Sequence, residues 1–528
     1  MTKTRLWLQG GGLAMLYLLP LIAYFLSPSQ NLFYHQVMPI TSLTRGVVLD
    51  LLLMALVLGA GFALLRRIQS LFLRRVLWLS ALFVTAFVTE RGLVDVLQNV
   101  SIGFNLPTWA EQFPWIVLAA AVPLLLFAPR YYDLVTKATE VFLMSAGIAT
   151  LFVVLPQLLY ACFNHAPAEQ ASFVHAVSQP WRPGEPRIVW VLFDELSYDQ
   201  VFEHRQPDID LPAFASLRQE SVSFSQLVPM GDQTELVIPS LFLGQPIYQL
   251  KSNRQGAMLW LSSPEKSWER FPPEDTVFAA AQRQGWGTGV AGWYNPYCRI
   301  LVSVLDRCYW THREFAFGGR FNRLYSRRSV WGNARDGFPL VPQIEKAWHH
   351  TSANQSHRLD YRSVLREAKS LIREENIRFA FIHLPVPHPP GIFADPAQSV
   401  GRREDYLGNL ILADQALAQL RAAIAKTSAA SNTIFIVSSD HSWRVSTWRG
   451  APGWTKAEER ATSGGVFDPR PVLMVRFPGQ NTPKQVDRPQ SEMIVHDLLL
   501  DLIAGKVRTP EEWIATLPSG TAGPHEAD

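Results

Sequence analysis

The stretch RIVWVLFDE, residues 187–195, places an unbroken apolar run directly before two carboxylates. A short run rich in β-branched and aromatic side chains predicts a strand that is buried on both faces of a sheet. In open parallel sheets, reactive side chains gather beyond the carboxyl ends of the strands. Asp194 and Glu195 stand at that place, so the stretch predicts a central strand with a candidate site at its end.

Strands and helices alternate through the rest of this domain. Further strands are predicted at 287–293, 378–384, 433–439 and 471–477, and helices at 277–286, 361–375, 405–425 and 491–505. The alternation predicts an α/β fold with a largely parallel central sheet covered by helices on both faces. His388 comes shortly after one strand, and Asp440 with His441 comes directly after another. These side chains are therefore expected at the same edge of the sheet as Asp194 and Glu195.

The composition divides the chain into a membrane part and a globular part. Hydrophobic residues make up 48% of the 528 residues, and the long uncharged runs lie in the first third. The pattern predicts a transmembrane domain at 1–165, a linker at 166–185, a catalytic domain at 186–508 and a flexible tail at 509–528. The net charge is only +3, and no long basic block follows residue 180, which argues against a nucleic-acid partner.

Five apolar stretches predict transmembrane helices. Each is compared with the roughly 20 residues that a helix needs to cross a bilayer. They lie at 6–26, 46–65, 76–97, 113–128 and 141–163. A cleavable signal peptide is the alternative for the first stretch, but no small-residue cleavage site follows it. Glu90, Arg91 and Asp95 end the third stretch and are placed at the membrane interface.

The basic residues predict the orientation of these spans. With the amino terminus in the cytoplasm, the cytoplasmic face receives most of them, and the short outer loops receive only Arg45 and Arg91. The cytoplasmic group is Lys3, Arg5, Arg66, Arg67, Arg74, Arg75, Arg130 and Lys137. An odd number of spans then places the catalytic domain outside the cytoplasm, where a disulfide between Cys298 and Cys308 is reasonable. Two free thiols are the alternative.

The polar residues at the strand ends form a candidate metal site. Asp194, Glu195, Asp440 and His441 offer oxygen and nitrogen ligands for one or two divalent ions. Each residue alone is weak evidence, because an acidic pair after a strand is often a helix cap. Their joint position at the strand ends favours a site.

At this point the sequence resembles the alkaline phosphatase and sulfatase-like superfamily, from about residue 186 to 505. Five segments occur in the family's order. They are VWVLFDELSYD at 189–199, TELVIPSLFLG at 234–244, LPVPHPP at 384–390, FIVSSDHS at 435–442 and SEMIVHDLLLDLIAG at 491–505. The first and fourth resemble the metal-binding strand ends of the family, and the second resembles its nucleophile segment.

The resemblance implies a role for each matching residue. The metal ligands would be Glu195, Thr234, Asp440 and His441, with Asp194 as an additional ligand. Thr234 would also be the nucleophile, and Pro239 stands five residues later, as in relatives that use threonine. His388 would contact the transferred group. A helix-capping role for Thr234 is the alternative, while His383 is taken as structural and Asp232 as a turn residue.

The details of these segments discriminate between branches of the superfamily. A formylglycine-dependent sulfatase needs cysteine or serine where Val237 stands, and arginine where Leu241 stands. Five spans with a threonine nucleophile instead resemble phosphoethanolamine transferases and phosphoglycerol transferases of the lipoteichoic acid synthase type. That resemblance implies a bacterial inner-membrane enzyme with a phospholipid donor and an envelope glycan or lipid as acceptor.

Two departures from the family pattern leave alternatives open. Ser442 follows His441 where glycine is common, and the segment before 471–477 lacks an expected histidine, for which Asp468 or Arg470 could substitute. A complete two-metal site is therefore in question, and Zn²⁺ and Mn²⁺ both suit the ligand set. The alternative functions are a membrane-anchored phosphodiesterase, phosphatase or sulfatase-like hydrolase, and a non-catalytic envelope-assembly protein.

Overall fold

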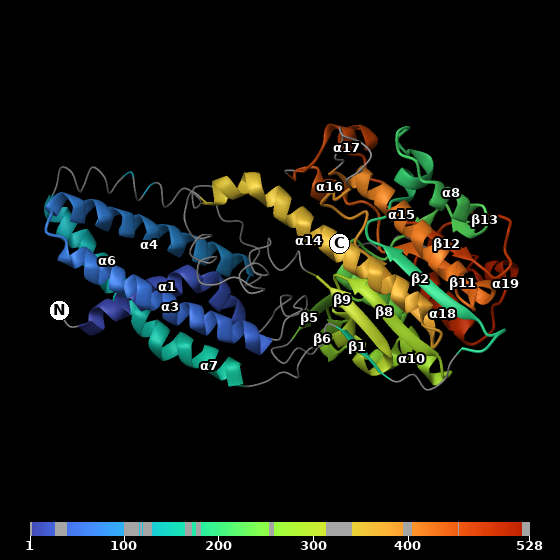
Figure 1. Ribbon diagram of the computed structural model, residues 1–528, viewed down its shortest axis with the longest axis horizontal. Coiled ribbons are helices and arrows are strands. Elements are labelled where there is room, and N and C mark those ends of the chain that lie inside the picture. The colour runs from blue at the N-terminus through green and yellow to red at the C-terminus, as the bar shows by residue number, and fades with distance from the viewer. Residues whose placement is uncertain are drawn as a thin grey trace.

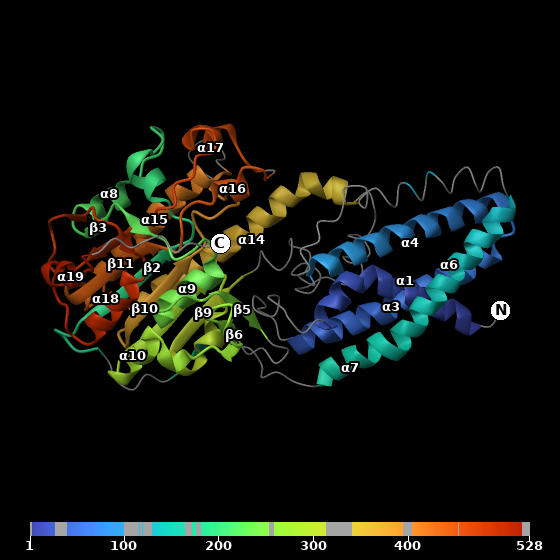
Figure 2. The same ribbon diagram turned by 180° about the vertical axis from the view of Figure 1, so that it is seen from behind.

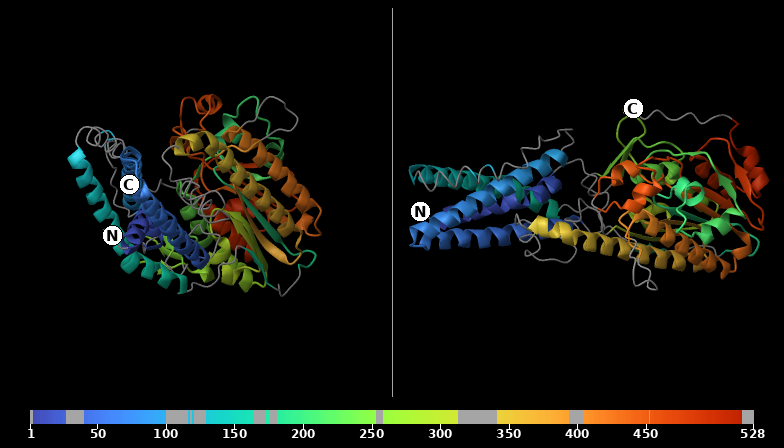
Figure 3. Two further views of the ribbon diagram at one scale, coloured as in Figure 1. Left: turned by 60° about the vertical axis from the view of Figure 1, so that its left-hand side comes forward. Right: turned by 90° about the horizontal axis from the view of Figure 1, so that it is seen from above.

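The computed structural model has two parts that lie end to end along its longest axis: an elongated helical assembly and an α/β domain (Figure 1, and from behind in Figure 2). The structure describes residues 3–26, 40–99, 116, 119, 129–163, 172–175, 181–252, 258–312, 341–393, 404–451 and 453–519. The two parts remain distinct when the molecule is seen from above (Figure 3).

The helical part is built around the first helix. Helix α1 (Lys3–Leu26) contacts α3 (Ile40–Arg67), α4 (Leu71–Asn99) and α6 (Pro129–Ala149), and α6 continues through a π-helical turn (Thr150–Val154) into α7 (Leu155–Phe163). Glycines allow the close approach of these helices. A Cβ atom at Gly12 would clash with the backbone of Leu143, and one at Gly147 would clash with the backbone of Leu8. Close packing through small residues is typical of membrane helices.

Two helices among the described residues are long and apolar enough to cross a membrane: Val47–Arg67 and Tyr131–Tyr160. They correspond to the second and fifth predicted spans. The first and third predicted spans form α1 and α4 but are not among these two, and the fourth, at 113–128, lies almost entirely outside the described residues. The structure therefore supports two candidate spans where the sequence predicts five. Large apolar side chains on α3, such as Leu52, Leu56 and Val57, are exposed.

Nine strands among the described residues form one sheet in the order β1-β9-β8-β10-β2-β11-β12-β3-β13. Its five central strands run parallel to one another: β9 (Arg307–Thr311), β8 (Gly287–Trp293), β10 (Ile377–Leu384), β2 (Arg187–Phe193) and β11 (Thr433–Ser439). The predicted, largely parallel sheet is therefore confirmed. Strand β12 (Leu473–Arg476) is antiparallel to both β11 and β3 (Val222–Phe224), which the sequence pattern did not indicate. At the edges, β1 (Ser172–Val174) pairs antiparallel with β9, and β13 (Lys484–Val486) pairs parallel with β3.

Alternating residues of β2 feed two hydrophobic cores, one on each face of the sheet. Ile188, Trp190 and Leu192 face one side of the sheet. They belong to the core that includes residues of α9 (Thr234–Leu243), α10 (Val277–Arg283) and α18 (Ile494–Ile503). Val189, Val191 and Phe193 face the other side. They belong to the core that includes residues of α8 (Pro212–Arg218), α14 (Val341–Arg373) and α15 (Tyr406–Ala425). All seven residues of β2 are buried, because both faces of a parallel sheet are covered.

Short elements complete the domain. These are β4 (Leu227–Val228), β5 (Gln249–Ser252), β6 (Met258–Leu261), β7 (Glu269–Arg270), β14 (Gln490–Ser491), α11 (Tyr297–Ile300), α16 (Val445–Trp448), α17 (Lys456–Ala461) and α19 (Pro510–Thr516), with π-helical Asp199–Glu203 and 3-10 turns Pro273–Asp275, Val302–Val304 and Ala430–Asn432.

Two predictions at the periphery have different outcomes. The predicted disulfide is present, since Cys298 at α11 is bonded to Cys308 in β9. The predicted tail at 509–528 begins too early, because α19 lies within it and is capped by Thr509. Trp513 is 2% exposed and contacts Phe224, so apolar burial ties this segment to the domain.

Candidate active site

The ends of three adjacent strands bring the predicted residues together. In the register of the sheet, Phe193 at the end of β2 pairs with Leu384 of β10 and with Ser439 of β11. The residues that follow each strand therefore emerge at the same level. They include Asp194, Glu195, His388, Asp440 and His441, and all five are buried.

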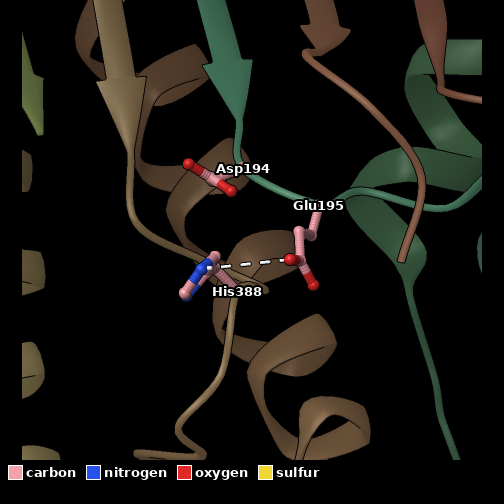
Figure 4. A group of neighbouring side chains, drawn as sticks. All are labelled: Asp194, Glu195 and His388. Atoms are coloured by element: carbon pink, nitrogen blue, oxygen red, sulfur yellow. Dashed lines mark ion pairs between the residues drawn. The ribbon is translucent and has the colours of Figure 1, made fainter. Parts of the chain in front are cut away.

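The carboxylates and imidazoles form two triads that share Asp194. One triad is Asp194, Asp440 and His441, and the other is Asp194, Glu195 and His388, shown in Figure 4. Within each triad, one ligand atom of every residue lies within 4.8 Å of the others. This arrangement can hold a metal ion.

Two buried carboxylate oxygens that accept no hydrogen bond favour an ion in the first triad. Asp194 Oδ1 and Asp440 Oδ2 are buried and accept no hydrogen bond among the described residues, and Asp440 Oδ2 lies 3.2 Å from His441 Nε2 of the same triad. A buried polar atom without a partner costs free energy, and an ionised carboxylate costs more. Carboxylate oxygens and an imidazole nitrogen match the ligand preferences of Zn²⁺ and Mn²⁺, so these residues fit the divalent ion that the sequence predicts.

Burial and mutual charge perturb the pKa values of this triad. Burial, reinforced by the charge of Asp440, holds the pKa of Asp194 well above its ordinary value. Burial also opposes ionisation of Asp440, but its interaction with His441 and His383 outweighs this and lowers its pKa. Although burial acts to lower the pKa of His441, the Asp440 carboxylate raises it. Asp440 and His441 thus behave as an ion pair when no other cation is present.

Thr234 lies beside the first triad at the start of α9. Its Oγ1 is 3.2 Å from His441 Nε2 and 3.5 Å from Asp194 Oδ2. The cap residue of α9 is Gln233, and Thr234 is the first helical residue, so its hydroxyl faces the site and does not cap the helix. The backbone carbonyl of Thr234 accepts a hydrogen bond from Asn295 Nδ2 at 3.2 Å. The amino terminus of a ten-residue helix also favours an anion at this place.

His388 is held in one tautomer on the other side of the centre. Its Nδ1–H donates to the carbonyl oxygen of Pro389, while its Nε2 accepts from Arg444 at 3.3 Å. Burial, and then the charge of Arg444, lower the pKa of His388 well below its ordinary value. The imidazole is therefore neutral near pH 7 and presents a lone pair at Nε2.

Two residues that the sequence did not indicate bind Glu195. Arg444 Nε donates to Glu195 Oε1 at 2.6 Å, and Trp448 Nε1 donates to the same carboxylate at 2.9 and 3.1 Å. Arg444 stands three residues after His441, so the proximity of a cation to the metal motif is the sequence signal that could have indicated it.

His383, predicted as structural, also contacts the site. Its Nε2 lies 3.1 Å from Asp194 Oδ2, and its Nδ1 accepts from the Tyr297 hydroxyl at 2.7 Å. Burial lowers the pKa of His383 to about 4, so the neutral ring donates from Nε2 to the carboxylate. His383 therefore orients Asp194.

The candidate substitutes for the missing histidine lie elsewhere. Arg470 pairs with Asp468 at 2.6 Å and with Glu203 at 2.5 Å, and neither Asp468 nor Arg470 has a described hydrogen bond to the site. Asp232 contributes its backbone carbonyl, which accepts from Arg444 at 3.2 Å. The side chain of Asp232 is exposed, as expected for a turn residue.

Three solved structures that align with part of this chain can be compared with it. A protein in the alkaline phosphatase superfamily from Vibrio parahaemolyticus is 16% identical over 62% of this chain and 68% of its own, with a TM-score of 0.37. Phosphonate monoester hydrolase of Agrobacterium radiobacter is 15% identical over 61% and 74%, with a TM-score of 0.36. PsFucS1 sulfatase from Pseudoalteromonas sp. is 13% identical over 60% and 68%, with a TM-score of 0.40.

No curated protein matches this chain. The sulfatase family model matches residues 186–505, which is more than half of the chain and contains every residue of the two triads. The chain therefore belongs to the sulfatase family, within the alkaline phosphatase and sulfatase superfamily.

Proposed function

We propose that this protein transfers a phospho-head group, phosphoethanolamine or phosphoglycerol, from a membrane phospholipid to a glycan or lipid of the bacterial envelope. The observation that carries the proposal is the position of Thr234. Its hydroxyl lies beside His441 and the buried carboxylate of Asp194, at the start of a helix, in a chain that also has apolar helices. A nucleophile next to a cation site is the arrangement that phosphoryl transfer needs.

In the first half-reaction, Thr234 is phosphorylated. Thr234 Oγ1 forms a bond to phosphorus, and the bond from phosphorus to the glycerol oxygen breaks. Diacylglycerol leaves with a proton that balances the one lost by the threonine hydroxyl. The product is a phosphorylated Thr234 that carries the head group. A divalent zinc or manganese ion bound by Asp194, Asp440 and His441, with Glu195 as the further ligand that the family resemblance implies, would lower the pKa of the hydroxyl and neutralise phosphoryl charge.

In the second half-reaction, the head group is transferred from Thr234 to the acceptor. A hydroxyl of the acceptor attacks phosphorus, its proton is transferred to the departing threonine oxygen, and the enzyme is restored. His388 is a neutral imidazole at this side of the centre, and its Nε2 accepts from Arg444. If the acceptor hydroxyl replaced Arg444 as the donor, Nε2 would take its proton, and the resulting Nε2–H would hold a phosphoryl oxygen. If water took the place of the acceptor, the same residues would catalyse hydrolysis.

The membrane part would supply the lipid donor. Under this proposal five spans cross a bacterial inner membrane with the amino terminus inside, and the catalytic domain faces the extracytoplasmic space. The two apolar helices, the basic pair Arg66 and Arg67 at the end of α3, and the disulfide in the catalytic domain support this arrangement.

Release of diacylglycerol from vesicles tests the proposal. The purified full chain is incubated with Mn²⁺ or Zn²⁺ and vesicles of phosphatidylethanolamine and phosphatidylglycerol, with and without envelope extract. We expect metal-dependent release, with the head group recovered on an acceptor from the extract. Thr234→Ala should abolish release. Thr433→Ala should not, because Thr433 is a buried threonine at the opposite end of β11 from Asp440.

The fate of the head group decides between the alternatives. A free head group in the presence of extract would favour a hydrolase, and no release from any vesicle would contradict the lipid-donor proposal.

A further inference from the structure

The start of α9 is weakly tied to the rest of its own helix. Thr234 is the first residue of α9, and Pro239 lies inside it. A proline has no N–H, and its ring clashes with the carbonyl four residues earlier, so residue 239 makes no backbone hydrogen bond to Glu235. The first turn of α9 nevertheless carries the hydroxyl that lies 3.2 Å from His441 Nε2. Contacts from outside the helix are therefore needed to hold it in place.

Two consecutive residues after β8 make contacts of this kind. Asn295 Nδ2 donates to the backbone carbonyl of Thr234 at 3.2 Å. The hydroxyl of Tyr294 donates to Glu235 Oε2, on the next residue of α9, at 3.0 Å. Asn295 is 0% exposed, so water does not compete for its hydrogen bond.

The backbone of Tyr294 is strained in a way that makes both contacts possible. Its φ is 68°, in the left-handed region, where a bulky residue is an outlier. Asn295 N donates to the carbonyl oxygen of Trp293 at 2.9 Å, which closes a three-residue turn around Tyr294. Consecutive side chains of an extended strand point to opposite faces, whereas across this turn both reach α9. Strained residues persist where their surroundings hold them, and they cluster at functional sites.

The turn is fixed to the sheet and to α14. Trp293, the last residue of β8, donates from Nε1 to Asp360 Oδ2 at 3.3 Å, and Asp360 Oδ1 accepts from Thr311 Oγ1 at 2.8 Å. Tyr294 N donates to the carbonyl oxygen of Thr311 at 3.3 Å. The turn therefore sets the position of the first turn of α9 relative to the sheet.

We propose that Tyr294 and Asn295 are positioning residues for Thr234, and that the strained turn at 293–295 keeps its hydroxyl directed at the metal site. This inference rests on Thr234 as the nucleophile of the proposed function, but not on the identity of the donor or the acceptor. Loss of either hydrogen bond would leave the threonine hydroxyl intact but let the first turn of α9 move. A small displacement of a reacting group slows the chemical step more than it weakens substrate binding.

Hydrogen exchange of the full chain in detergent with Mn²⁺ tests the structural half of the inference. Leu236 N and Val237 N both donate to the carbonyl of Gln233, so their exchange reports on the first turn of α9. Asn295→Ala and Tyr294→Phe should speed exchange in this turn by roughly fivefold or more. Strand β11, at 433–439, should be unaffected, which separates a local effect from general destabilisation.

Single-turnover kinetics test the functional half. Formation of the Thr234 adduct is followed by intact mass with vesicles of phosphatidylethanolamine and phosphatidylglycerol. In both variants the rate at saturating vesicles should fall by about 10–100-fold, while the lipid concentration that gives half the maximal rate stays that of wild type. A purely structural defect would instead lower the amount of active protein and leave the rate constant of the remainder unchanged.

Gln480→Ala is the matched control. It removes a buried side-chain amide that donates to the Thr482 carbonyl at 3.1 Å, and it follows β12 at the opposite edge of the sheet. Gln480→Ala should change neither the exchange of α9 nor the rate constant.

Wild-type exchange in α9, or a wild-type rate constant, in either variant would overturn the inference. If Asn295→Ala does not fold, Tyr294→Phe, which keeps the ring, decides. Absence of an adduct in wild type would refute the proposed function, and exchange would still decide whether the turn holds the start of α9.

Discussion

Tyr297→Phe removes one hydroxyl that lies two hydrogen bonds from the candidate metal ion. The hydroxyl donates to His383 Nδ1 at 2.7 Å, and His383 Nε2 lies 3.1 Å from Asp194 Oδ2. Both His383 and Tyr297 are fully buried, and a Cβ atom at Gly292 would clash with the tyrosine ring, so the glycine leaves room for it. The substitution keeps the ring and deletes only the donor.

Two magnitudes follow from these contacts. The buried His383 Nδ1 loses its donor, which costs about 1–3 kcal/mol of unfolding free energy. Without that donor, the proton of the imidazole is no longer confined to Nε2, and the hydrogen bond that orients Asp194 weakens. Loss of such a supporting contact typically lowers metal affinity by about 10–100-fold. The effect on metal binding should therefore be larger than a purely structural role would give.

The assay combines urea unfolding of the metal-free protein with a chelator-competition titration of Mn²⁺. Tyr361→Phe is the matched control, because the hydroxyl of this buried tyrosine donates to the Leu412 carbonyl and has no described hydrogen bond to the site. It should lose stability but keep wild-type metal affinity. If the two variants bind Mn²⁺ equally well, His383 does not orient a metal ligand and the reasoning fails.

Three further substitutions test other parts of the account. Gly244 has a left-handed backbone (φ 73°), and a Cβ atom there would clash with the His496 ring. Gly244→Ala should therefore lower the unfolding free energy by at least about 1–2 kcal/mol and lower Tm in a thermal scan. A Tm at or above that of wild type would contradict the fold around α9. Replacing Cys298 and Cys308 by serine opens a loop with a sequence separation of 10 and should cost about 2–3 kcal/mol, measured by urea unfolding against the reduced wild type, which should match the double variant. Burial raises the folded-state pKa of Glu492, so its contribution to stability is complete below pH 4.5 and is lost as the pH rises. The unfolding free energy of Glu492→Gln should therefore increase relative to that of wild type between pH 4.5 and 8. A constant difference over that range would be incompatible with a buried, neutral carboxyl.

The strand pattern gave the α/β domain and the edge of the sheet at which its site lies, because buried parallel strands and their helices leave strong periodic signals. Asp194, Asp440 and His441 follow strands directly, so predicting the strands placed them together. The antiparallel direction of β12 could not be predicted, since a short buried strand has the same composition in either direction. The membrane part was predicted less well, because hydropathy alone does not separate a spanning helix from another apolar helix.

The contacts within the site required the structure. The roles of Arg444 and Trp448 depend on the short helix α16, which turns both side chains toward Glu195. The role of His383 depends on Tyr297, which is 86 residues away in the chain. Hydrogen bonds between residues far apart in the chain leave no local pattern in the sequence. Residues at the ends of strands can be predicted, because the strands before them have a clear pattern.

The central claim is that Thr234 carries the transferred group, and intact-mass analysis with peptide mapping tests it most directly. The purified full chain is mixed with Mn²⁺ or Zn²⁺ and vesicles of phosphatidylethanolamine and phosphatidylglycerol, then quenched with acid. We predict a metal-dependent adduct on Thr234 whose mass identifies the head group, and no adduct in Thr234→Ala. Diacylglycerol release that persists in Thr234→Ala, or an adduct that maps to another residue, would contradict the account.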